Sequence, residues 1–90
     1  MNRELKWLNV KEMELIGEVT FITEYNSDNR HFIFRVEGAS SDCICFLEDD
    51  SNWDSVYDCM CEPRVKIVVK EIAISVEDNK VFANVIRIGE

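Results

Sequence analysis

One convincing helical segment interrupts a chain that otherwise has the pattern of β-strands. Ser51 is followed three residues later by Asp54, which resembles a capping box built with the shorter acid. Four residues then recur at i, i+3, i+4 and i+7 and form one apolar helical face: Trp53, Val56, Tyr57 and Met60. Pro63, the single proline, prevents the helix from continuing. The sequence therefore predicts a short helix whose apolar face is buried.

Five further segments show the alternation of apolar and polar residues that is typical of strands. They cover residues 15–25, 30–38, 43–47, 64–76 and 81–88, with polar turns between them. In the first three segments, the residues expected to share a face are Leu15, Gly17, Val19 and Phe21, then Phe32, Phe34 and Val36, then Cys43 and Cys45. The residues predicted to point outward from the second and third are His31, Ile33, Arg35, Ile44 and Phe46.

The fourth of these segments changes its apolar phase midway. Its apolar residues occupy odd positions as far as Val69 and even positions from Ile72 onward. Because a shift of one residue turns a side chain to the opposite face of a sheet, the phase change predicts a β-bulge near Lys70 and Glu71.

The order of these elements limits the fold. Three strands, a helix and two more strands predict an all-β fold, a five-stranded Greek-key barrel with one short α-helix between strands three and four. Closure removes the long unpaired edges that a small open sheet would expose. Ninety residues suffice for a single domain. We expect it to span 1–90, with an N-terminal arm at 1–12 and the barrel at 13–88.

Several segments of the chain resemble the oligonucleotide/oligosaccharide-binding fold (OB-fold). LIGEVTFI is similar to the opening strand of that family, in which a glycine allows the strand to coil sharply. HFIFRVEG is similar to the second strand of the family, and CICF resembles the third strand as found in single-strand-binding members such as the replication protein A domains. MCEPRVKIVV resembles the entry to the fourth strand. The resemblance implies a non-catalytic module that binds single-stranded DNA or RNA, as in DNA replication.

The resemblance also implies where the ligand binds, namely on the outer face of strands two and three. There an aromatic side chain stacks on bases while basic side chains contact phosphates. The expected nucleic-acid-binding residues are Arg30, His31, Ile33, Arg35, Phe46, Lys66, Lys70 and Lys80. In the alternative interpretation, Phe46 is covered by the helix or a loop, and the arginines are ordinary surface charges.

The charge balance favours a second function. The chain carries 18 acidic against 10 basic residues and a net charge of −8, which opposes non-specific attraction to nucleic acid. An acidic strip beside the helix would instead attract a basic partner protein. The alternative is therefore a protein-interaction subunit of a nucleic-acid-processing complex. Its expected contact residues are Trp7, Leu8, Val10, Asp49, Asp50 and Asp54.

The four cysteines form two Cys-X-Cys pairs, Cys43 with Cys45 and Cys59 with Cys61. Structural zinc sites usually separate paired cysteines by two or more residues, so the spacing argues against a metal. We expect Cys43 and Cys45 to be small apolar residues of the interior, and Cys59 and Cys61 to be more accessible. No metal or other cofactor is expected.

The sequence contains no phosphate-binding glycine loop and no nucleophile motif, so we expect no enzymatic activity. Its first residues alternate charged and apolar side chains, unlike a signal peptide, and no apolar run is long enough to cross a membrane. These features predict a cytoplasmic protein with reduced thiols and no membrane partner.

Overall fold

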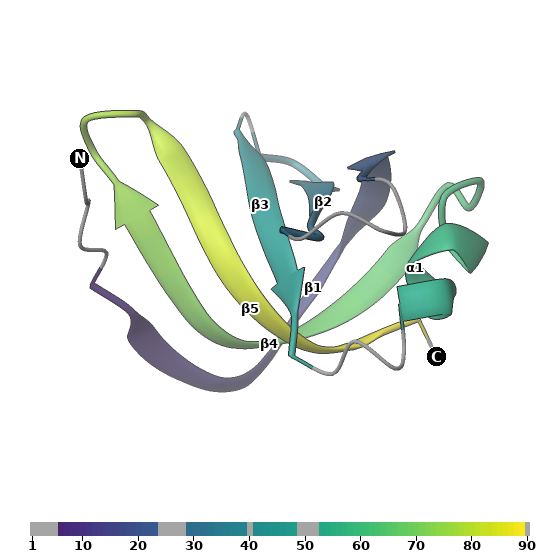
Figure 1. The fold of residues 1–90 in the computed structure, drawn as a ribbon, viewed down its shortest axis with the longest axis horizontal. Coiled ribbons are helices and arrows are strands. Elements are labelled where there is room, and N and C mark those ends of the chain that lie inside the picture. Colours follow the sequence, from purple (N-terminus) through teal and green to yellow (C-terminus); the bar gives the residue numbers. More distant parts are fainter. Residues whose placement is uncertain (1–5, 24–28, 40, 49–52, 90) are drawn as a thin grey trace.

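The computed structural model describes residues 6–23, 29–39, 41–48 and 53–89. Five strands and one helix follow one another in the predicted order (Figure 1). Their bounds are β1 Leu8–Ile22, β2 Phe32–Val36, β3 Asp42–Leu47, α1 Trp53–Asp58, β4 Val65–Ser75 and β5 Lys80–Ile88. Within the described part of the chain, no helix is both long and apolar enough to cross a membrane.

The strands close into a barrel in the order β1-β2-β3-β5-β4, and β4 pairs again with β1. Only the β3–β5 pair is parallel among the strand pairs described, and the others are antiparallel. The prediction of an all-β, closed five-stranded barrel with a helix between strands three and four is confirmed.

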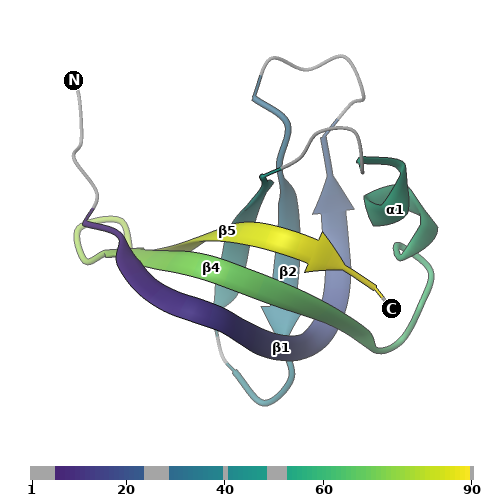
Figure 2. The same ribbon diagram turned by 90° about the horizontal axis from the view of Figure 1, so that it is seen from below.

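β1 begins at Leu8, which differs from the expected arm at 1–12. Leu8 lies opposite Ile72 of β4, and Asn9 lies opposite Glu71, so this part of the chain belongs to the sheet. β1, β4 and β5 therefore extend side by side beyond the barrel at the end away from α1 (Figure 2).

The long strand β1 pairs with both β2 and β4 because it bends at Gly17. This residue lies opposite Val36 of β2 and also opposite Val65 of β4. A Cβ atom at position 17 would collide with the backbone carbonyl oxygen of Arg35 and lie 2.9 Å from the Phe34 ring. Only glycine allows the strands to approach so closely at the bend.

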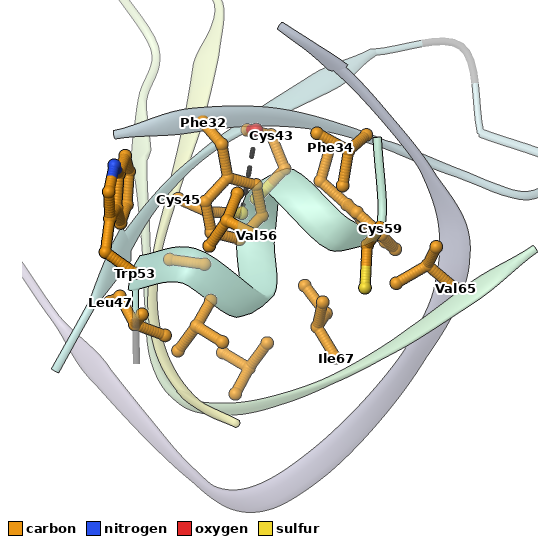
Figure 3. Packing of buried hydrophobic residues seen from close by; sticks show 14 residues of the cluster. Phe32, Phe34, Cys43, Cys45, Leu47, Trp53, Val56, Cys59, Val65 and Ile67 are labelled. Atoms are coloured by element: carbon orange, nitrogen blue, oxygen red, sulfur yellow. Dashed lines mark hydrogen bonds between the residues drawn. The ribbon is translucent and has the colours of Figure 1, made fainter. Parts of the chain in front are cut away.

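The core fills the barrel, and α1 closes one of its ends. Trp53, Val56 and Cys59 point inward from the helix and the turn after it, toward Phe32 and Phe34 (Figure 3). The strands contribute the other buried apolar residues: Val19, Cys43, Cys45, Leu47, Val65, Ile67, Val69, Ala83 and Val85. The predicted inward positions of β2 and β3 are therefore correct.

The predicted helical face is wrong in its second half. Tyr57 is 39% exposed and Met60 is 40% exposed, whereas Cys59 is buried. The reason is that α1 ends at Asp58, and the chain then turns so that the Cys59 side chain enters the core. The Tyr57 hydroxyl donates to the carbonyl oxygen of Thr23 at 2.8 Å, at the edge of the barrel.

A bulge in β4 confirms the predicted change of phase. Val69 lies opposite Val85 of β5, and Glu71 lies opposite the next residue, Asn84, so Lys70 is the extra residue. Beyond the bulge, Ile72 packs against the core.

A second bulge lies in β1, where the sequence predicts regular alternation. The pairing with β2 shifts between Val19 and Phe21. Phe21 therefore lies opposite Ile33, on the outer face of the barrel, and Ile22 lies opposite the buried Phe32. The prediction that Phe21 shares a face with Val19 is wrong, because a bulge reverses the facing of all later residues.

Candidate functional site

Four ring side chains lie in a row across the outer face of the barrel, and we call this set the aromatic row. Phe21 of β1 is 6.3 Å from His31, measured between ring centroids, and His31 is 6.0 Å from Phe46 of β3. Phe46 is 6.4 Å from Phe82 of β5, and their planes differ by only 9°. The row therefore runs without a break from β1 to β5.

The backbone fixes the position of His31 within the row. Its backbone N–H donates to the Thr23 hydroxyl at 3.1 Å, and its carbonyl oxygen accepts from the Thr23 N–H at 3.1 Å. The ring nitrogen Nδ1 lies 2.9 Å from the carbonyl oxygen of Asn29, which can only accept, so Nδ1 carries the proton in this contact. These bonds hold the imidazole between the Phe21 and Phe46 rings.

Aliphatic side chains adjoin the row on the same face. Ile33 of β2 lies opposite Phe21 on one side and Ile44 of β3 on the other, and Ile44 lies opposite Phe82. Phe21 is 50% exposed, while the other members of the face are partly buried. The face is therefore apolar and partly open to solvent, which is unusual for the outside of a small barrel.

An open cavity of about 550 Å³ adjoins this face near the β4–β5 turn. Its apolar floor is formed by Phe21, Ile33 and Ile44, each from a different strand. Its polar lining consists of Thr20, Ser41, Asp42, Asn79 and Lys80. A volume of this size is within the range of sites that bind small organic molecules.

Charges around the face are nearly balanced. Arg35 donates from Nε to Oδ1 of Asp42 at 3.2 Å, so this cation is paired with an acid on the adjacent strand. Lys80 lines the cavity and makes no ion pair within the described part of the chain. Lys70 donates to Glu48 at 2.9 Å, and this hydrogen bond and the negative charge of Glu48 raise the pKa of Lys70.

The structure brings some of the predicted nucleic-acid-binding residues together and separates others. His31, Ile33 and Phe46 share the outer face, and Arg35 and Lys80 lie at its margins. Arg30 instead stacks over the Trp53 ring at 5.6 Å, beside α1. Lys66 lies on β4, which pairs with β1 and β5, and its ammonium group is 3.8 Å from Glu14.

Sequence reasoning missed two members of the aromatic row, Phe21 and Phe82. Phe82 is opposite Ile44 because β3 and β5 pair in parallel, a relationship between distant segments that local alternation does not reveal. Phe21 reaches the outer face only through the bulge in β1.

The residues expected to contact a partner protein are dispersed. Leu8 is 65% exposed near the start of β1, whereas Val10 packs against the core and Trp7 is partly buried. Asp54 is exposed in the first turn of α1, and Asp49 and Asp50 lie outside the described residues. Two further exposed apolar residues share the end of the barrel with Leu8: Ile74 at 60% and Val76 at 87%.

Three of the four cysteines belong to the interior. Cys43, Cys45 and Cys59 are buried and Cys61 is exposed, so the expectation that Cys59 is accessible is wrong. The Cys45 thiol lies 3.7 Å from the carbonyl oxygen of Cys43, and the hydrogen bond to Cys43, together with burial, raises the pKa of Cys45. Within the described ranges, no group of three or more histidine, cysteine or acidic side chains is arranged to hold a metal ion.

Comparison with known proteins gives no relative for this chain. No protein-family model, curated protein or solved structure matches it.

Proposed function

We propose that this protein is an OB-type, non-catalytic module that binds single-stranded nucleic acid on the outer face of β1, β2, β3 and β5. The observation that carries the proposal is the aromatic row, in which successive rings are 6.0 to 6.4 Å apart. Single strands bind to such platforms because every base has a face that stacks on an aromatic ring.

Burial of these rings in the core would argue against the proposal, but the core has its own aromatic residues. Phe32, Phe34 and Trp53 are 1% exposed or less, whereas Phe21 is half exposed. Stacking on an exposed aromatic ring contributes about 1–3 kcal/mol per base. Two or three stacked bases therefore supply about 2–9 kcal/mol, and the upper end of this range reaches the binding free energy of a micromolar complex, about 8 kcal/mol.

The proposed ligand is bound mainly by stacking, because the face has few cations. Arg35 and Lys80 adjoin it, and Arg35 is partly neutralised by Asp42. The net charge of −8 also repels phosphates at long range. A single strand with unstacked bases fits these conditions better than duplex DNA, whose bases are not accessible for stacking.

Fluorescence anisotropy with a labelled single-stranded oligonucleotide tests the proposal. The protein should bind at low salt, and the double variant Phe46→Ala, Arg35→Ala should lose binding. A matched control is Arg64→Ala, because Arg64 is an exposed arginine paired with Glu37 and is not part of the aromatic row. Absence of binding at low salt, or an equal loss in the control, would contradict the proposal.

A second candidate function is supported by the exposed apolar residues at the far end of β1, β4 and β5. Leu8, Ile74 and Val76 are more than half exposed there. Such residues are typical of a contact with another protein. The interaction subunit becomes the better interpretation if no oligonucleotide binds at low salt while Leu8→Asp or Ile74→Asp abolishes co-purification of a partner.

A further inference from the structure

We propose that Asp42 gives this face a preference for guanine. The inference rests on the proposed function and adds to it the identity of the base. Asp42 is the first residue of β3, and its side chain lines the cavity of about 550 Å³ beside the aromatic row. A base that stacks at this end of the face would place its edge against the Asp42 carboxylate.

Arg35 holds that carboxylate in place. Its Nε–H donates to Oδ1 at 3.2 Å, and within the described residues Oδ2 accepts no hydrogen bond. The Asp42 side chain is 45% exposed, so Oδ2 is accessible from the cavity. A carboxylate has about four lone-pair positions, and Oδ1 can accept a second bond while it keeps the one from Arg35. Arg35 is therefore a positioning residue.

The lining of the cavity combines the kinds of side chain that contact a nucleotide. Phe21, Ile33 and Ile44 provide an apolar floor on which the plane of a base can lie. Lys80 lies at the rim, where an ammonium group can contact a phosphate. Asp42 would thus accept hydrogen bonds from the base of a nucleotide, and Lys80 would contact a phosphate of the same nucleotide.

The chemistry of the bases selects guanine. Guanine presents two adjacent donors, N1–H and N2–H, and a carboxylate can accept both in a bidentate, charge-assisted pair. Adenine and cytosine present an amino group beside a ring nitrogen whose lone pair repels the second carboxylate oxygen. Thymine and uracil place a carbonyl oxygen on each side of N3–H, so both repel the carboxylate. A good bidentate pair contributes about 1–3 kcal/mol of discrimination, which is about 5- to 150-fold in affinity.

The test compares three labelled decamers with the full-length protein. Each has a thymine background, and two separated positions carry guanine, hypoxanthine or thymine. Hypoxanthine keeps N1–H and lacks the 2-amino group, so it removes one of the two bonds without changing the size of the ring system. Wild-type protein should bind the guanine decamer about 10-fold more tightly than the thymine decamer, with the hypoxanthine decamer between them.

The variant Asp42→Asn should bind the three decamers within about 3-fold of one another, because its amide has only one acceptor oxygen. Arg35→Gln should reduce the ratio of guanine to thymine affinity, and because it also removes a cation beside the face, affinity for all three decamers should fall. Thermal melting of both variants verifies that they are folded. If the wild type binds all three decamers with equal affinity, the guanine preference is overturned and the proposed function still stands. Failure of all three to bind would overturn both.

Discussion

The rings of Phe46 and Phe82 stack with 6.4 Å between their centroids and 9° between their planes. Parallel pairing of β3 with β5 creates this contact. Ile44 lies opposite Phe82, and Phe46, two residues after Ile44, is the next residue of β3 on the same face. The two rings form the flattest part of the aromatic row, and the other ring pairs are tilted by 40° and 58°. A base can therefore lie parallel to both phenylalanine rings at this position.

Replacement of Phe82 should weaken oligonucleotide binding. Phe82→Ala removes one stacking surface, and the expected loss is about 1–3 kcal/mol, or about 5- to 150-fold in Kd by anisotropy. Phe82→Leu retains most of the apolar volume without a ring, so it should lower affinity similarly while preserving the melting temperature better. If Phe82→Leu binds as tightly as the wild type, stacking at this position is not part of recognition.

The sequence predicts the architecture better than it predicts the site. Alternation along β2 and β3 is regular: the inward positions Phe32, Phe34, Cys43 and Cys45 are buried as expected, and Val36 packs against the core while partly buried. The change of apolar phase in β4 predicts its bulge because three alternating apolar residues lie on each side of the slip. In β1, apolar residues occur on both faces, and alternation cannot reveal which of Val19, Phe21 and Ile22 face the core.

The end of α1 and the pairing of charges could not be predicted from the sequence because both depend on contacts between distant segments. The i, i+3, i+4, i+7 pattern assumes that α1 continues to Met60, whereas the helix ends at Asp58 and the turn after it brings Cys59 into the core. Arg35 and Lys70 appear as free cations in the sequence, whereas folding places Asp42 and Glu48 beside them. A count of basic residues therefore overestimates the charge available to phosphates.

Oligonucleotide binding should depend only weakly on salt. Two cations, Arg35 and Lys80, adjoin the face, and each phosphate contact to a single strand adds about −0.7 to the slope of log K against log salt. The expected slope is therefore about −1.4. Lys80→Ala should make it shallower by about 0.7, whereas Lys66→Ala, on another side of the barrel, should leave it unchanged. A slope steeper than about −4 would show that phosphate contacts outside this face dominate.

Gly17→Ala should destabilise the fold strongly. The added Cβ would overlap the carbonyl oxygen of Arg35, and neither strand can move without breaking the pairing of β1 with β2. The expected loss is about 3 kcal/mol or more, which lowers Tm by about 12 °C or more for a domain of this size. Thermal unfolding followed by circular dichroism provides the measurement.

Gly38→Ala is the matched control for that substitution. Gly38 has φ +84 and no atom within 4 Å of an added Cβ, so only the left-handed backbone penalty applies. That penalty is about 1–2 kcal/mol. If Gly38→Ala lowers Tm as much as Gly17→Ala, close approach of β1 to β2 is not what requires glycine at position 17.

The raised thiol pKa values predict a loss of stability in alkaline solution. Burial raises the pKa of Cys59, with smaller contributions from the negative charges of Glu62 and Asp58, and the pKa of Cys45 is raised further. A thiol with a raised pKa holds its proton longer in the folded state. The stabilisation that comes from these protonated thiols is therefore fully present below about pH 8.5, the ordinary pKa of a thiol in the unfolded chain. It is lost as the pH rises toward the higher pKa values of the thiols in the folded protein.

Urea unfolding at pH 7.5 and pH 9.5 measures this loss, and the control is Cys59→Ala. The variant should be less stable than the wild type at neutral pH because a buried side chain is truncated, but its stability should fall less between the two pH values. An equal fall in both proteins would show that Cys59 does not contribute to the alkaline loss.

Native alkylation should divide the thiols three to one. Cys61 is exposed and should react within minutes, whereas Cys43, Cys45 and Cys59 are buried and should react only when the barrel opens. Mass spectrometry after brief treatment with iodoacetamide should find one modified cysteine, and Cys61→Ser should leave none. A chelator should change nothing, because the buried thiols are protected by packing.

If Cys59 reacts as fast as Cys61, the turn after α1 does not seal the end of the barrel. If all four thiols become reactive together when a chelator is added, a metal ion holds them and the metal-free interpretation is wrong.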